Sequence, residues 1–247
     1  MLAFAAMMVG RRDEAIKAID TMVAEMPMEF QEQAAPFVDG FFAMPFEVRK
    51  RFGMWDEVLA LPDLPERFPI SRAIRHAARS VSYAAKGMPL EARAEQSHFY
   101  VARKAVPESA VFGQSSGRLI VETAHQLMNG EILIAENKPE AAILALRRAA
   151  AAEDKLRYSE PPDWIQPTRH TLGAYLLKLG RHTEAEKVYR DDLRKLPKNG
   201  WALNGLAESL RRAGKGTEAA KYRAMFERMW AKADVEIKSS CLCIPDP

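Results

Sequence analysis

The sequence has very few cysteines: Cys241 and Cys243 are the two in 247 residues. A framework of several disulfides is therefore excluded, because two cysteines separated by one residue do not close a useful loop. Two thiols also fall short of the four ligands that a closed zinc site needs. We therefore predict that residues 234–247 form a reduced, unstructured tail, and metal binding by Cys241 and Cys243 stays open as the alternative.

Long apolar runs are also missing. The opening segment MLAFAAMMVG reaches Arg11 and Arg12 before it is long enough to cross a bilayer, and it lacks the basic start of a signal peptide. The sequence thus predicts a cytoplasmic protein that has no membrane partner.

A strong excess of either charge is absent as well. The 36 basic and 33 acidic side chains give a formal net charge of +3, which is too small to require a nucleic-acid partner. Basic residues outnumber acidic residues between positions 176 and 232. That part of the chain therefore fits an acidic partner better than the rest does.

Residues that favour strands are sparse and alanine is abundant, so the composition favours helices. One short pattern recurs with small variations: a glycine, three residues, a glutamate and an alanine. Its copies fit a turn between two helices, in which the glycine takes the left-handed conformation that ends the first helix and the glutamate favours the start of the second. The copies start at Gly10, Gly53, Gly87, Asn137, Gly180 and Gly214.

A unit of 34 residues underlies the pattern, since that number separates Gly53 from Gly87 and Gly180 from Gly214. The clearest unit, 166–199, resembles the tetratricopeptide repeat family, a 34-residue helix-turn-helix unit, at several positions of its pattern. The resemblance implies an all-α fold, namely a right-handed superhelical solenoid of tandem helix-turn-helix units. The matching positions are Leu172, Gly173, Gly180, Ala185, Tyr189 and Pro197.

Six units are predicted along the chain, two of them imperfect. In the degenerate unit, Pro45 is expected to interrupt the first helix and Pro62 to shorten the second. The truncated first unit is expected to be either part of a longer solenoid or a shortened cap, and its apolar edge would be formed by Met1, Leu2, Phe4 and Met8. The units cover 1–29 (truncated), 39–69 (degenerate), 73–106, 123–156, 166–199 and 200–233, and the tail covers 234–247.

Three insertions separate these units. Residues 27–45 are rich in Phe and Met, which fits core packing or an adaptable binding groove. Residues 107–117 are rich in Gly and Ser and are predicted to be mobile. In residues 159–167, Asp163 and Gln166 have the spacing of a capping box, which would start the next helix about a turn early. Trp164 is predicted to pack against a neighbouring repeat, with an exposed anchor as the alternative.

The sequence shows no motif for catalysis. Its histidines are scattered without a metal-binding pair at helical spacing. The segment GKGT at 214–217 resembles part of a phosphate loop, but Ser209 stands where the upstream glycine would be. We therefore predict that the protein is not an enzyme and uses no cofactor and no metal.

The family resemblance places ligand contacts on the first helix of each unit, along the concave face. Helical spacing independently puts Trp201, Asn204, Glu208 and Arg212 along one stripe. The basic side chains would pair with carboxylates of a partner, and the alternative is a solvated face. A carboxylate clamp known in part of the family is not supported, because Leu127 and Glu131 stand at its positions. The predicted contacts are His170, Lys178, Trp201, Asn204, Glu208, Arg211 and Arg212.

The sequence thus predicts a non-catalytic scaffold or adaptor that binds a protein or peptide, with an acidic segment as one option. One alternative is a helical repeat that binds nucleic acid. That reading is weaker, because Trp201 is the one aromatic residue on the stripe where base stacking needs a series. The other alternative is an auxiliary domain of a larger enzyme.

Overall fold

Within the described part of the chain, six turns between helices contain a residue in the left-handed backbone conformation. The computed structural model describes residues 1–244, so the end of the predicted tail, 245–247, lies outside the described residues. The predicted left-handed residues are confirmed, including Asn137 with φ 56°, since asparagine tolerates this conformation better than most residues. The glycine φ angles are 74° at Gly10, 68° at Gly53, 73° at Gly87, 73° at Gly180 and 76° at Gly214.

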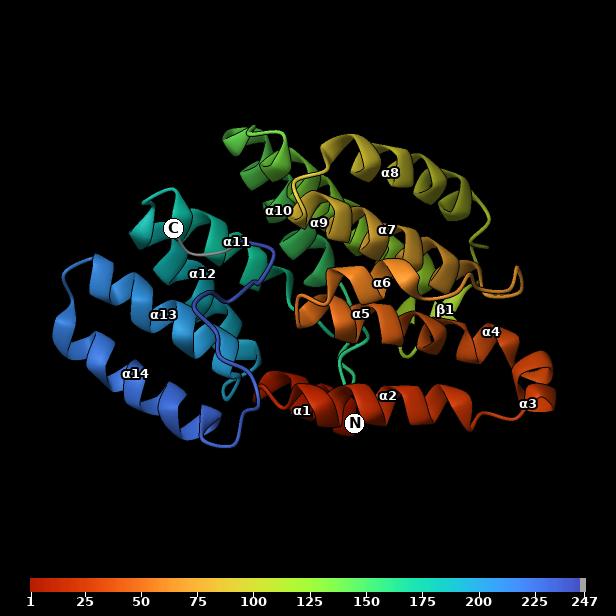
Figure 1. The fold of residues 1–247 in the computed structure, drawn as a ribbon, viewed down its shortest axis with the longest axis horizontal. Helices are drawn as coiled ribbons and strands as arrows, with labels where there is room; N and C mark the ends of the chain where they lie inside the picture. Colours follow the sequence, from red (N-terminus) through yellow and green to blue (C-terminus); the bar gives the residue numbers. More distant parts are fainter. Residues whose placement is uncertain (245–247) are drawn as a thin grey trace.

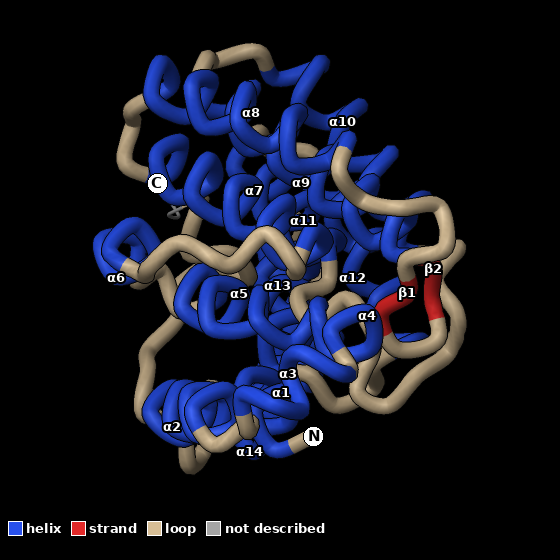
Figure 2. The backbone as a smooth tube through the Cα atoms, turned by 90° about the vertical axis from the view of Figure 1, so that its right-hand side faces the viewer, coloured by secondary structure: helices blue, strands red, loops and turns tan. Residues whose placement is uncertain are grey.

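Each of these turns joins two helices, and one such pair lies within or closely overlaps each predicted unit (Figure 1). The fold is all-α, as predicted, apart from one two-stranded hairpin among the described residues (Figure 2). The pairs are α1 (Leu2–Met8) with α2 (Arg12–Ala24), α5 (Met44–Arg51) with α6 (Trp55–Ala60), α7 (Pro69–Ala85) with α8 (Pro89–Lys104), α9 (Gly117–Ala135) with α10 (Pro139–Glu153), α11 (Thr168–Lys178) with α12 (His182–Lys195), and α13 (Gly200–Arg212) with α14 (Gly216–Trp230).

Successive pairs pack on one another. Helix α5 contacts α1 and α2 on one side and α7 on the other, α7 contacts α9, α10 contacts α11, and α12 contacts α13. Small residues allow close approach within a pair: a Cβ on Gly173 of α11 would lie 2.4 Å from the Tyr189 ring of α12. The core is therefore continuous along the array, and it is built from the apolar faces of neighbouring helices.

The first and last pairs also touch each other (Figure 1). The Trp201 indole Nε1 donates a hydrogen bond to the Met7 carbonyl at 2.7 Å. The Trp230 ring lies between two glycines, because a Cβ on Gly10 or on Gly200 would fall 2.3 Å from it. The expected open edge is therefore covered at Met8, which is buried, whereas Met1 and Leu2 are exposed.

Asp234, which follows α14, caps the second helix of the chain. Its carboxylate accepts hydrogen bonds from the backbone N–H groups of Arg12 at 2.6 Å and Asp13 at 2.9 Å, at the start of α2. Its own N–H donates to the Gly10 carbonyl at 3.1 Å. A carboxylate at a helix N-terminus satisfies unpaired donors and opposes the helix dipole, so this contact stabilises the closure between the two ends of the array.

The first insertion and the adjoining unit differ from the predictions. The insertion is largely helical, with α3 (Met28–Gln33), α4 (Ala35–Val38) and the 3₁₀ helix η1 (Asp39–Ala43). Within it Phe42 is buried, which fits the predicted core packing, whereas Phe37 is 71% exposed. The alternative, a binding groove, stays a prediction. Pro45 lies in the first turn of α5 and does not interrupt it, since a proline is tolerated there. Helix α6 ends at Ala60, before Pro62, as predicted.

The second and third insertions are anchored to the core. The second contains the hairpin of β1 (Val111–Phe112) and β2 (Ser115–Ser116), and Phe112 packs edge-on against Phe41. In the third, Trp164 is buried, which confirms the packing role. The predicted capping box is wrong: α11 begins at Thr168, and Asp163 instead accepts a hydrogen bond from the Gln114 N–H at 3.1 Å.

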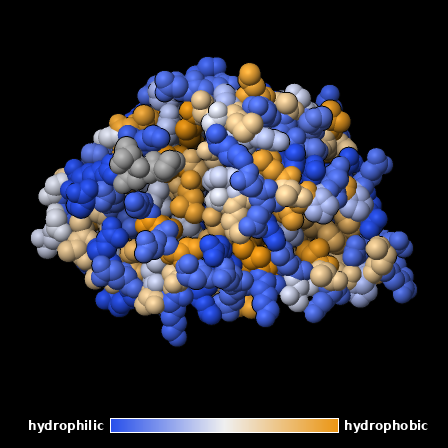
Figure 3. Space-filling view, viewed as in Figure 1, coloured by the Kyte–Doolittle hydropathy of each residue, from blue (hydrophilic) through white to orange (hydrophobic). Residues whose placement is uncertain are grey.

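Hydrophilic residues cover most of the face shown in Figure 3, with apolar residues between them. Among residues 1–244, none of the helices combines the length and the apolar character required to cross a bilayer.

Candidate functional site

The tail of the chain passes through the middle of the molecule. In Figure 1 it runs from the end of α14 past α13 to the side of α11. Ser240, Cys241 and Ile244 are 1%, 3% and 2% exposed, so the prediction of an unstructured tail is wrong for residues 234–244. Residues 238–244 fill a space between α5, α9, α11 and α13, and we call this space the tail channel.

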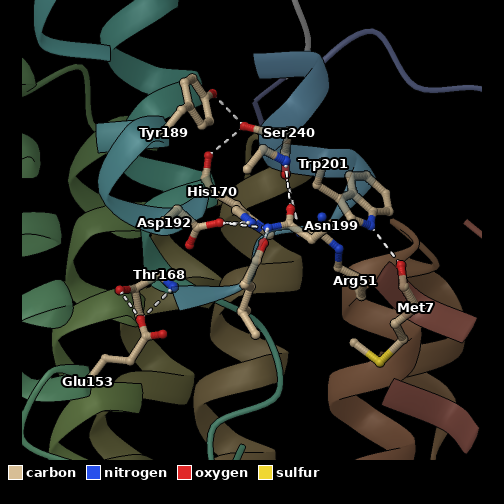
Figure 4. A network of polar contacts seen from close by, with 12 residues as sticks. Met7, Arg51, Glu153, Thr168, His170, Tyr189, Asp192, Asn199, Trp201 and Ser240 are labelled. Atoms are coloured by element: carbon tan, nitrogen blue, oxygen red, sulfur yellow. Dashed lines mark hydrogen bonds and ion pairs between the residues drawn. The ribbon is translucent and has the colours of Figure 1, made fainter. Parts of the chain in front are cut away.

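Ser240 is the most closely held residue of the tail (Figure 4). Its carbonyl accepts a hydrogen bond from Arg51 Nη1 of α5 at 3.2 Å. Its hydroxyl donates to the His170 carbonyl of α11 at 2.8 Å and lies 2.6 Å from the Tyr189 hydroxyl of α12. Buried polar atoms require such partners, so these three helices together fix the position of the tail.

His170 faces a buried acid and not a partner protein. Its Nε2 lies 3.0 Å from the Asp192 carboxylate, which also accepts a hydrogen bond from Asn199 at 2.9 Å (Figure 4). Burial lowers the pKa of His170 despite this carboxylate. The prediction that its side chain contacts a partner therefore fails in this structure, because its imidazole is 0% exposed and contact with the tail is through its carbonyl.

Trp201 is fully buried, which also removes it from the accessible face. The Arg51 guanidinium carbon lies 3.3 Å from the centre of its ring, and Trp230 packs edge-on at 5.2 Å. Burial lowers the pKa of Arg51, whose Nε and Nη2 have no hydrogen-bond partner in the described chain. This cation therefore stacks on the indole and donates one hydrogen bond to the Ser240 carbonyl.

Four of the remaining predicted residues lie on α13 and Lys178 lies on α11. Asn204 is buried and accepts a hydrogen bond from Arg223 at 2.9 Å. Glu208 accepts from Arg211 at 2.6 Å and from Arg212 at 2.5 Å, and the adjacent guanidinium of Arg211 lowers the pKa of Glu208 to about 2. The two arginines thus already pair with an acid of their own helix, while part of each side chain reaches solvent.

The structure brings part of the predicted stripe together against the tail. One small pocket, of about 10 Å³, remains between α11, α13 and the tail, and it is lined by Lys178, Asn204 and Glu208 from the predicted set and by Lys238, Ser240 and Ile244 from the tail. This volume is about that of a single water molecule. The chain itself therefore occupies the face on which the sequence placed a partner.

A second polar cluster lies where the two cysteines enter the tail channel. Cys241 and Cys243 form a disulfide with each other, which the sequence reasoning did not expect, and both are buried. Glu131 Oε1 of α9 lies 4.0 Å from Cys241 Sγ, and Thr171 Oγ1 of α11 lies 3.4 Å from the same sulfur. Burial raises the pKa of Glu131 to about 7.

A glutamate of α10 binds the first residue of α11. Glu153 of α10 accepts hydrogen bonds from the Thr168 N–H at 2.8 Å and from the Thr168 hydroxyl at 2.5 Å (Figure 4). Burial raises the pKa of Glu153 to about 7 in spite of these donors. This side chain supplies the helix cap that the sequence had assigned to Asp163.

Sequence reasoning missed Arg51, Glu131 and Ser240 as parts of this site. Glu131 was considered at a clamp position, and nothing in the neighbourhood of Arg51 or Ser240 marks either as a contact across the molecule. Tyr189 was identified as a repeat position, and its hydroxyl contact with Ser240 was not.

A scan against protein-family models found no match, and a search of curated proteins found no significant match.

Proposed function

We propose that this chain is a tetratricopeptide-like solenoid that binds a protein segment without catalysing a reaction. The observation that carries the proposal is the occupied tail channel: a non-helical segment of this chain is held there by side chains from α5, α11 and α12. The six pairs with a left-handed residue at equivalent turns support the repeat architecture.

The contacts in the channel suit segments of more than one sequence. Arg51 binds a backbone carbonyl of the tail, and the His170 carbonyl accepts from a side chain as small as serine. Backbone contacts give affinity without requiring a particular side chain, whereas the buried position of Ile244 defines an apolar subsite. A partner segment would therefore bind where residues 238–244 now lie, in competition with them.

An acidic partner fits the rim of the channel. Lys178 of α11 lines the pocket beside the tail, and Arg211 and Arg212 lie at the end of α13. Side chains at a rim mainly set the association rate and the selectivity for charge. The nucleic-acid alternative loses the one aromatic residue of the stripe, since Trp201 is buried and cannot stack on a base.

The proposal is tested with the full chain and a labelled peptide of residues 234–247, under reducing conditions. Ile244→Asp places a carboxylate at a buried apolar position, so the resident tail should leave the channel. Because the resident tail competes with the peptide, its loss should tighten peptide binding by at least about 10-fold. Glu236→Gln, at an exposed tail position, is the control and should bind as the unmodified chain does.

Fluorescence anisotropy gives the dissociation constants, and circular dichroism verifies that each variant is folded. A folded Ile244→Asp variant that binds the peptide no better than the Glu236→Gln control would contradict the proposal.

A further inference from the structure

Cys241, Cys243 and Glu131 form a cluster that the peptide-binding role does not use. The three side chains are buried, and their sulfur and carboxylate atoms lie within 4.8 Å of one another. Glu131 belongs to α9, which forms one wall of the tail channel, whereas the two cysteines belong to the tail that fills the channel. The cluster exists only while the tail is docked.

Glu131 has no obvious structural role of its own. It is 3% exposed, and no ion-pair partner for it is found within residues 1–244. Lys50, whose charge lowers the pKa of Glu131, already binds both carboxylate oxygens of Glu47 at 2.7 Å. A buried carboxylate without a counter-charge is unfavourable, so its retention beside two sulfurs calls for a positive ligand.

We propose that the reduced form of this cluster binds one Zn²⁺ ion, with Cys241, Cys243 and Glu131 as ligands. Reduction by a dithiol breaks the bond between the two sulfurs: the dithiol supplies two electrons and two protons and is itself oxidised to a disulfide. Binding of Zn²⁺ then forms two zinc–sulfur bonds and releases the two thiol protons. The site is therefore available only in the reduced protein.

The geometry allows these three ligands to reach one ion. Two zinc–sulfur bonds of about 2.3 Å at the tetrahedral angle place the sulfurs about 3.8 Å apart. The Cα atoms of Cys241 and Cys243 are 5.2 Å apart, which lets both side chains point to a shared ion. Thr171 Oγ1, at 3.4 Å and 3.9 Å from the two sulfurs, or a water molecule, completes a fourth position.

The charge of the cluster favours a divalent, thiophilic ion. Two thiolates and a carboxylate carry three negative charges in a buried site, and a dication reduces this excess to one. Hard cations such as Mg²⁺ prefer oxygen ligands, whereas Zn²⁺ accepts thiolate and carboxylate together. Because its ligands come from α9 and from the tail, the ion would fasten the tail in its channel.

The experiment uses the full chain without an affinity tag, freed of metal and kept reduced with a phosphine. Titration with Co²⁺ as a spectroscopic substitute should give the thiolate-to-cobalt charge-transfer band and the visible bands of a tetrahedral site, saturating at one ion per chain. Addition of Zn²⁺ should displace Co²⁺ and abolish the bands. This readout needs no peptide, so it is separate from the test of the proposed function.

Variants identify the ligands. Glu131→Gln and Cys243→Ser should each weaken Zn²⁺ binding by at least about 10-fold, the smallest loss usual when even an outer partner of a metal site is removed. Glu153→Gln, which changes a partly buried glutamate outside the cluster, should bind like the unmodified chain. Circular dichroism verifies that each variant is folded, and Glu131→Gln keeps the shape of the side chain.

Absence of the cobalt bands in the reduced unmodified chain would overturn the proposal. So would equal Zn²⁺ affinities of the Glu131→Gln and Glu153→Gln variants, because Glu131 would then not be a ligand.

Discussion

Closure of the array between its first and last helix pairs can be tested with two glycines. Gly10 and Gly87 have nearly equal φ angles, 74° and 73°, and each stands between the two helices of a pair. A Cβ on Gly87 would meet no atom within 4 Å, whereas a Cβ on Gly10 would lie 2.3 to 2.7 Å from three atoms of the Trp230 ring. The substitutions Gly10→Ala and Gly87→Ala therefore cause the same backbone strain, but only Gly10→Ala also overlaps with the last helix pair.

The expected free energies follow from these two terms. Left-handed alanine costs about 1–2 kcal/mol, so Gly87→Ala should lower the free energy of unfolding by that amount. Gly10→Ala adds the overlap with Trp230, which costs about 1–3 kcal/mol more in a packed site. Trp230 cannot easily move aside, since its Nε1 donates a hydrogen bond to the Val235 carbonyl at 2.7 Å and its ring packs on Phe226 and Trp201.

Equilibrium unfolding in urea, followed by far-UV circular dichroism, measures both variants against the unmodified chain. In a Trp230→Ala background, Gly10→Ala should lose most of its additional cost relative to Trp230→Ala alone, because the overlapping ring is then absent. If Gly10→Ala and Gly87→Ala destabilise the protein equally, the first and last pairs are not in contact in solution.

Three further predictions concern the pH response, one turn and the rim of the channel. Glu153 has a folded-state pKa of about 7 against an ordinary value of 4.5, so it stabilises the fold fully below about pH 4.5 and this contribution is lost as the pH rises to about 7. Glu153→Gln, which stays neutral, should therefore gain up to about 3 kcal/mol relative to the unmodified chain between pH 5 and pH 8 in urea unfolding; a gap that does not change with pH would disprove the cause. Asn137→Ala should lower the unfolding free energy by about 1 kcal/mol because φ is positive there, while Asn137→Gly should stay close to the unmodified chain, and thermal unfolding of the two variants distinguishes them. Replacing Arg211 and Arg212 by Glu in the Ile244→Asp background should weaken binding of an acidic peptide in anisotropy measurements and change stability by less than about 1 kcal/mol, and unchanged affinity would argue against a basic rim.

The turns could be predicted from the sequence because their requirement is local. A left-handed residue after a helix has to be glycine or asparagine, so Gly180 or Asn137 reveals itself by type and spacing alone. The error at Pro45 is also local. A proline interrupts the interior of a helix but is tolerated in its first turn, and Pro45 lies in the first turn because the helix begins at Met44.

The site could be predicted only in part, because its decisive contacts join distant residues. Helical spacing correctly placed Asn204 and Glu208 on the face that now lines the tail channel. Helical spacing could not predict whether these side chains are exposed to solvent. Trp201 is covered by Met7 and Arg51, which belong to the first two helix pairs. The position of Ser240 depends on Arg51, 189 residues earlier, and no periodic pattern encodes such a pair.

The contact between the ends of the array has a consequence for synthesis of the protein on the ribosome. An ordinary repeat array has contacts mainly between neighbouring units, so it can fold unit by unit as the chain emerges. Here Met7 binds Trp201 and Arg12 binds Asp234, across 194 and 222 residues. The earliest helices therefore wait for almost the whole chain before their final contacts form, and their apolar surface is available to chaperones during that interval.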